Sequence, residues 1–160
     1  VALSLSDPFC VNRHKDDFLE LIREHVSVVM GNHAEATALT GTSTPEDAIE
    51  ALSAHCDVAA VTLDSKGSLL RSEGQNVQIP CFPVTAIDTT GAGDAFAAGL
   101  LYGMTQGIDL RASGHIASYV AGKVVSQLGP RLESVERDII ERLKAGAGFS
   151  EILKLEEAKA

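Results

Sequence analysis

Residues 88–96 decide the fold of this chain, and they read Asp88-Thr89-Thr90-Gly91-Ala92-Gly93-Asp94-Ala95-Phe96. A β-prone segment precedes them and a helix-forming pattern follows. Glycines allow positive φ and close backbone approach. The first N–H groups of the following helix would face a bound anion, with the positive end of the helix dipole behind them. Because Asp94 falls in the first turn, the stretch predicts an anion cradle with a carboxylate beside it.

Two common glycine-rich loops do not match this stretch. A P-loop requires Lys and Ser or Thr after its last glycine, and no Lys follows here. A dinucleotide-binding fingerprint requires a small third residue, where this chain has Phe96. An ordinary helix start with an acidic first turn stays open as the alternative on the residues alone.

The composition is that of a globular protein, and its 160 residues favour one domain. The net charge of −9 argues against a nucleic-acid partner, because such proteins present a basic face. No run approaches the ~20 apolar residues that span a bilayer, and no secretory signal is visible. The three cysteines form no Cys-x-x-Cys pair, which argues against zinc and favours a reducing cytoplasm.

Strand and helix patterns alternate along the chain, which predicts an α/β fold with a mostly parallel sheet flanked by helices. The expected strands are 1–5, 26–30 and 58–63, with 67–71 as a hairpin partner and 77–87 as an irregular, strand-like segment. The expected helices are 16–24, 35–39, 45–56, 91–104, 110–127, 136–145 and 150–158.

Asn32 and Glu35 follow a predicted strand end, where open α/β sheets place their ligands. An amide oxygen and a carboxylate suit a hydrated Mg²⁺. The alternative is a capping box, in which Asn32 caps the next helix and Glu35 reaches back to it.

The motif at residues 88–96 closely resembles the second signature of the PfkB carbohydrate kinase family, which includes ribokinases, fructokinases and adenosine kinases. The resemblance implies a ribokinase-like fold and ATP-dependent phosphorylation of a sugar or nucleoside hydroxyl. It also implies that Asp94 is the catalytic base and that Gly91, Ala92 and Gly93 form the anion hole. Phosphoryl transfer needs positioning, charge neutralisation and a base near the hydroxyl, so the chemistry agrees.

Two further segments resemble nucleotide-handling motifs of the same family. Asn32 and Glu35 match its Asn-x-x-Glu motif, which organises metal and phosphate. Residues 62–67 resemble its Thr-x-Gly-x-x-Gly loop, which implies nucleotide contacts for Thr62, Lys66 and Gly67. Asp64 stands where many relatives have glycine, and a plain hairpin turn is the alternative.

Two smaller groups complete the expected site. Several relatives hold a monovalent cation, K⁺ being the candidate here, at places that correspond to Asp88, Thr90 and Gly129. The alternative is that Asp88 caps its own loop. His115 and Ser118 fall near the adenine pocket of the family, and a structural role is the alternative for His115.

The resemblance covers only the carboxyl-terminal half of the family, because no sugar-binding half precedes Val1. The isolated chain is therefore expected to show little kinase activity. The segment from Ser6 to Val11 resembles adenosine-kinase-like members and favours a nucleoside or ribosyl substrate. The expected partners are ATP, Mg²⁺, a small sugar or nucleoside and the missing half, with a homodimer as a possible assembly.

Two other classes of function stay open. One is a non-catalytic nucleotide-binding α/β module that binds ATP but has no acceptor site. The other is a structural or partner-binding domain that does not bind ATP.

Overall fold

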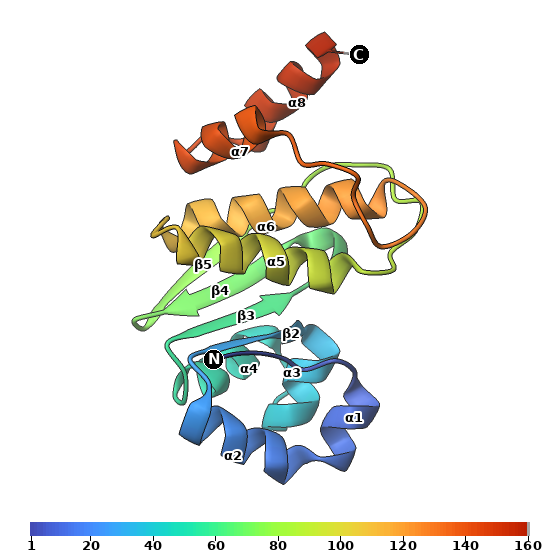
Figure 1. The fold of residues 1–160 in the computed structure, drawn as a ribbon. Helices are drawn as coiled ribbons and strands as arrows, with labels where there is room; N and C mark the ends of the chain where they lie inside the picture. Colours follow the sequence, from blue (N-terminus) through green and yellow to red (C-terminus); the bar gives the residue numbers. More distant parts are fainter. Residues whose placement is uncertain (160) are drawn as a thin grey trace. The chain divides into compact units, whose positions relative to one another are not determined.

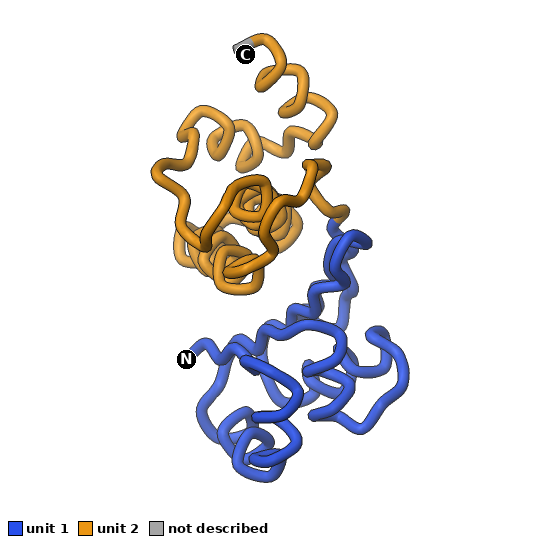
Figure 2. Tube along the Cα trace, turned by 90° about the vertical axis from the view of Figure 1, so that its right-hand side faces the viewer, with its two compact units in different colours: residues 1–79 blue, residues 80–160 orange. Residues whose placement is uncertain are grey.

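The computed structural model describes residues 1–159 and divides the chain into two compact units that meet at residues 79 and 80 (Figure 2). Residues 1–79 form an α/β unit, and the following residues form a helical unit. Each unit has its own buried apolar cluster.

The first unit contains one five-stranded sheet with the strands in sequence order (Figure 1). Its strands are β1 (Ala2–Ser4), β2 (Val28–Asn32), β3 (Val58–Thr62), β4 (Ser68–Ser72) and β5 (Gln75–Ile79). β1, β2 and β3 are parallel, and β4 and β5 are antiparallel to the strands before them. The sheet is therefore mixed rather than mostly parallel, because short connections can join only antiparallel neighbours.

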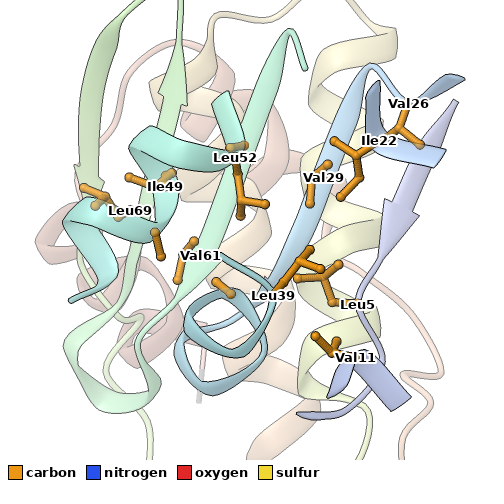
Figure 3. Close-up of a cluster of buried hydrophobic side chains, with 13 residues drawn as sticks. Leu5, Val11, Ile22, Val26, Val29, Leu39, Ile49, Leu52, Val61 and Leu69 are labelled. Carbon is orange, nitrogen blue, oxygen red and sulfur yellow. The ribbon is translucent and has the colours of Figure 1, made fainter. Parts of the chain in front are cut away.

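Four helices lie in the two crossovers between the parallel strands. They are α1 (Pro8–Arg13), α2 (Lys15–His25), α3 (His33–Thr40) and α4 (Pro45–Ser53). The sequence analysis did not predict α1, although Pro8 at its first turn and Asp7 as its cap are ordinary helix-start signals. Figure 3 shows side chains of these helices meeting Val29 of β2 and Val61 of β3. The helices therefore cover one face of the sheet.

The second unit contains α5 (Ala92–Thr105), α6 (Leu110–Val125), α7 (Arg137–Lys144) and α8 (Phe149–Lys159). α5 and α6 lie side by side at very short range, since a methyl group on Gly99 would lie 2.6 Å from Cα of Ala117. Phe82 and Tyr119 pack edge to face with ring centroids 5.0 Å apart, inside an apolar cluster that includes residues of α6, α7 and α8. Of the helices described, none has the length and apolarity to cross a membrane.

We expect Leu39→Ala to lower the free energy of unfolding by about 2–5 kcal/mol, because it leaves a cavity that the surrounding side chains fill only in part. Leu39 is completely buried, whereas Leu21 of α2 is 45% exposed. Leu21→Ala is the matched control and should change the free energy by about 0.5 kcal/mol or less. Urea denaturation of both variants measures the difference, and equal losses would contradict the assignment of this core.

Candidate functional site

The start of α5 has the geometry of an anion-binding helix terminus. Gly91 precedes the helix in the left-handed conformation, with φ 81° and ψ 2°. No side chain among the described residues caps this helix start. The N–H of Ala92 donates to the Thr89 carbonyl at 3.2 Å, and that of Ala95 donates to the Gly91 carbonyl at 2.9 Å. The N–H groups of Gly93 and Asp94 are the donors left for an anion.

Asp94 is exposed in the first turn of α5. Within the described part of the chain, its carboxylate has no hydrogen bond or ion pair. An exposed carboxylate of this kind is free to accept a proton or a hydrogen bond from a ligand. The predicted base and the predicted anion hole thus occupy consecutive residues of one helix start.

Asp88 joins two loops of the second unit. Its Oδ1 accepts a hydrogen bond from the N–H of Thr90 at 2.9 Å. Its Oδ2 accepts one from the N–H of Gly129 at 3.1 Å, across 41 residues of sequence. The structure therefore brings Asp88, Thr90 and Gly129 together, as the predicted cation site requires. It also gives Asp88 the loop-capping role considered as the alternative.

Asn32 and Glu35 form a complete capping box at the start of α3. Asn32 Oδ1 accepts from the Glu35 N–H at 2.9 Å, while the Glu35 carboxylate accepts from the N–H and Nδ2 of Asn32 at 2.8 and 2.7 Å. Glu35 is only 6% exposed. The alternative considered from the sequence is thus present, and the metal role remains a prediction.

The donor set at this strand end fits Mg²⁺ only in a limited way. Glu35 supplies one carboxylate, and both of its oxygens already accept a hydrogen bond. Among residues 1–159, no group of three or more His, Cys, Asp or Glu side chains is placed to hold a metal ion. Mg²⁺ commonly keeps several waters and takes its remaining ligands from one or two carboxylates and substrate phosphates. The residues therefore suit a hydrated ion rather than a fully protein-bound one.

The loop after β3 lies beside this group within the first unit. Thr62 is the register partner of Asn32, so the two residues end neighbouring parallel strands. The 3₁₀ turn η1 (Asp64–Lys66) follows, and Lys66 is exposed on it. Gly67 has φ 91° and ψ −131°, a backbone conformation that essentially only glycine adopts. Asp64 has φ 52°, so the position where many relatives have glycine is also left-handed here.

The two α6 residues predicted near adenine both have internal contacts. Ser118 is buried; its hydroxyl donates to the Pro80 carbonyl at 2.8 Å and accepts from the Phe82 N–H at 2.9 Å. His115 packs edge to face on Phe149, and burial and the charge of Arg111 lower its pKa. Both residues therefore have structural roles, and their nucleotide contacts remain predictions.

Pro130 lies against the anion loop, although the sequence indicated it only as part of the loop 127–130 expected to complete the cation site. A methyl group on Gly91 would lie 2.5 Å from Cβ of Pro130, so the two residues are in direct contact. The two positions are far apart in the sequence, and no local pattern connects them. The only available signal was that Pro130 follows Gly129, which was already a candidate.

We expect the contacts of Asp88 to persist well into acid. Hydrogen bonds from Thr90 and Gly129 hold the pKa of Asp88 below its ordinary value of 3.8. A group whose pKa is lowered by folding stabilises the fold above its unfolded pKa, and this contribution is lost as the pH falls through the folded pKa. Amide resonances of Thr90 and Gly129, followed from neutral pH downwards, should therefore shift with a midpoint below 3.8. Asp88→Asn should abolish this transition, and a midpoint above the ordinary value would contradict the assignment.

Comparison with known proteins identifies relatives over most of the chain. A nucleoside kinase of Methanocaldococcus jannaschii is 33% identical over 132 residues, which cover 81% of this chain and 43% of that protein. An adenosine kinase structure from Sinorhizobium meliloti aligns with a TM-score of 0.82 and 38% identity, over 91% of this chain and 44% of that chain. A fructokinase from Vibrio cholerae O395, solved in fructose, ADP and calcium ion bound form, aligns with a TM-score of 0.68 and 26% identity, over 81% of this chain and 46% of that chain.

These alignments confirm the ribokinase-like α/β fold predicted from the sequence. The chain spans less than half the length of the curated relatives that it matches first, with 48%, 43% and 40% of them covered. The model of the pfkB family carbohydrate kinases matches residues 1–137. This chain therefore belongs to the pfkB family of carbohydrate kinases.

Proposed function

We propose that this chain is the carboxyl-terminal, phosphate-handling part of an ATP-dependent kinase that phosphorylates a hydroxyl of a sugar or nucleoside. The observation that carries the proposal is the start of α5. There, Gly91 is left-handed, and within the described residues no side chain caps the helix and the exposed Asp94 carboxylate has no hydrogen bond. A helix start that leaves its donors open beside a free carboxylate offers both groups that phosphoryl transfer to an alcohol needs.

Asp94 is the base in this proposal. A hydroxyl is a weak nucleophile, and a carboxylate within hydrogen-bond reach takes up its proton as the phosphoryl group arrives. The N–H groups of Gly93 and Asp94, at the positive end of the α5 dipole, stabilise the charge on the equatorial oxygens of that group. The Ala92 N–H already donates to the Thr89 carbonyl and is not available to the phosphate. Gly91 and Ala92 therefore contribute to the anion hole through their backbone conformation rather than as donors.

The ends of β2 and β3 hold the ATP phosphates and Mg²⁺ in this proposal. Mg²⁺ would supply charge neutralisation of the phosphates, and Asn32 and Glu35 would hold it through its waters. Thr62 offers a hydroxyl, Lys66 offers an exposed cation, and Gly67 lets the nucleotide approach the backbone. His115 and Ser118 would line the adenine side, and K⁺ would bind near Asp88, Thr90 and Gly129.

The class of acceptor in this proposal comes from the relatives, of which the chain spans less than half the length. A nucleoside kinase and an adenosine kinase stand among the similar proteins, together with a fructokinase that binds fructose. The segment from Ser6 to Val11 favours the adenosine-kinase-like branch, and therefore a nucleoside or ribosyl acceptor. Three free cysteines agree with a reducing cytoplasm as the site of action.

Asp94→Asn tests the base assignment in an enzyme that has an amino-terminal half of the family supplied by fusion. We expect turnover to fall about 10²–10⁴-fold, because an amide cannot accept the proton, while ATP affinity is unchanged. Asp47→Asn is the matched control, since Asp47 also lies in the first turn of a helix but in α4. Steady-state kinetics measure the turnover of both variants, and an unchanged turnover of the Asp94 variant would contradict the base assignment.

The rival functions differ in their response to ATP. Calorimetric titration of the chain with Mg-ATP should give measurable heat if it is a kinase part or a non-catalytic nucleotide-binding module. A purely structural domain should give none. Binding of Mg-ATP without any turnover, even with an amino-terminal half supplied, would favour the non-catalytic module.

A further inference from the structure

The turn after α6 contacts the anion loop, and none of the roles proposed for the site residues involves this contact. Pro130 lies directly against Gly91. A methyl group on Gly91 would lie 2.5 Å from Cβ of Pro130, closer than Cβ atoms approach other atoms in proteins, and 3.0 Å from its Cα. The proline thus occupies the space that a side chain at residue 91 would need. Gly91 is also the residue whose left-handed backbone directs the chain into α5.

Hydrogen bonds attach the same turn to the segment before Gly91. The N–H groups of Ile87 and Asp88 donate to the Val125 carbonyl at 2.7 and 3.2 Å. The Gly129 N–H donates to Oδ2 of Asp88 at 3.1 Å. Residues 87–91 and 125–130 are therefore fixed to each other by polar bonds on one side and by the Gly91–Pro130 contact on the other. Both segments belong to the second unit.

We propose that Pro130 is a positioning residue for the anion hole, which fixes Gly91 and thereby the direction of the free N–H groups at the start of α5. The inference rests on the proposed function, because it gives the contact a role only if those N–H groups bind phosphate. The support is the contact itself, which Cβ and Cα of Pro130 make with Gly91; the locked φ of proline restricts the turn in addition. Donors that act on a transferring phosphoryl group must be held within fractions of an ångström, and rigid support supplies this.

Because of where Pro130 lies, its effect on the anion hole can be distinguished from an effect on the stability of the fold. Pro130 is exposed, so its replacement removes no part of the buried core. Leu128 lies two residues earlier in the same turn and is 83% exposed. A glycine at residue 128 also loosens the backbone of the turn but leaves the contact with Gly91 intact. Leu128→Gly is therefore the matched control for Pro130→Gly.

The experiment titrates the 160-residue chain with inorganic phosphate and follows the amide resonances of Gly93 and Asp94. We expect Pro130→Gly to weaken phosphate binding about tenfold, because the loop loses its rigid support. Pro130→Ala keeps the Cβ that meets Gly91 and should bind nearly as the native chain does. Leu128→Gly should bind as the native chain. Pro130→Val, whose branched side chain crowds Gly91, should also weaken binding and replaces the glycine variant if that variant does not fold.

Each outcome decides the proposal. Native phosphate affinity in Pro130→Gly, with unmoved amide resonances from Gly91 to Asp94, would overturn it. Weaker binding that Pro130→Ala restores and Leu128→Gly does not share would support it. If the native chain binds no phosphate at these amides, the anion-hole assignment of the proposed function fails instead. The fixing of Gly91 by Pro130 is still decided by the free protein: displaced resonances of Gly91 to Asp94 in Pro130→Gly alone support it, and unmoved ones refute it.

Discussion

The parallel pairing of β1, β2 and β3 is the constraint on which the first unit depends. A parallel neighbour can be reached only by a crossover, so each of the two connections must carry helices back along the sheet. The four helices bury Leu39, Ile49 and the inward side chains of the strands on one face. The same pairing places Asn32 beside Thr62 in register, at the carboxyl ends of their strands. Packing and site position in this unit therefore follow from one hydrogen-bonding pattern.

A different constraint governs the second unit, where the backbone at Gly91 must turn left-handed to enter α5. A side chain at this position would be strained by its φ and would collide with Pro130. The requirement for glycine is therefore both conformational and steric. It leaves the helix without a capping side chain, since glycine has none to offer. The lack of a cap is also what leaves N–H donors available to an anion.

Much of the fold was predictable from local patterns, and the exceptions have physical reasons. The sequence predicted the helix that starts at Pro45 after Thr44, and it predicted the hairpin partner of β3. Both features depend on residues that are neighbours in the chain. The second antiparallel pair, between β4 and β5, was not predicted, because the segment from residue 77 onwards was expected to be irregular. Helix α1 was missed because six residues give too short a period to recognise.

The candidate site also has parts that local sequence predicts and parts that depend on contacts between distant residues. The loop at Gly91 and the strand ends at Asn32 and Thr62 were found because their chemistry lies in consecutive residues. The contact of Pro130 with Gly91 and the hydrogen bond from Gly129 to Asp88 join residues about 40 positions apart. No local pattern connects such residues, and only the family resemblance placed Asp88 and Gly129 at one site. The hydrogen bonds of Ser118 with Pro80 and Phe82 also join distant residues and could not be predicted from the sequence; its nucleotide contact stays a prediction.

The capping box at Asn32 and the proposed metal role of Glu35 are compatible rather than exclusive. A buried carboxylate is costly unless hydrogen bonds or a cation compensate its charge. Both bonds that the structure gives Glu35 come from Asn32, and a methyl group on Gly31 would lie 3.0 Å from Oε2 of Glu35. The box thus holds the carboxylate in one orientation at the end of β2, where glycine leaves room for it. A carboxylate that is already oriented loses little freedom when a hydrated cation approaches, so the cap prepares the group for binding instead of competing with it.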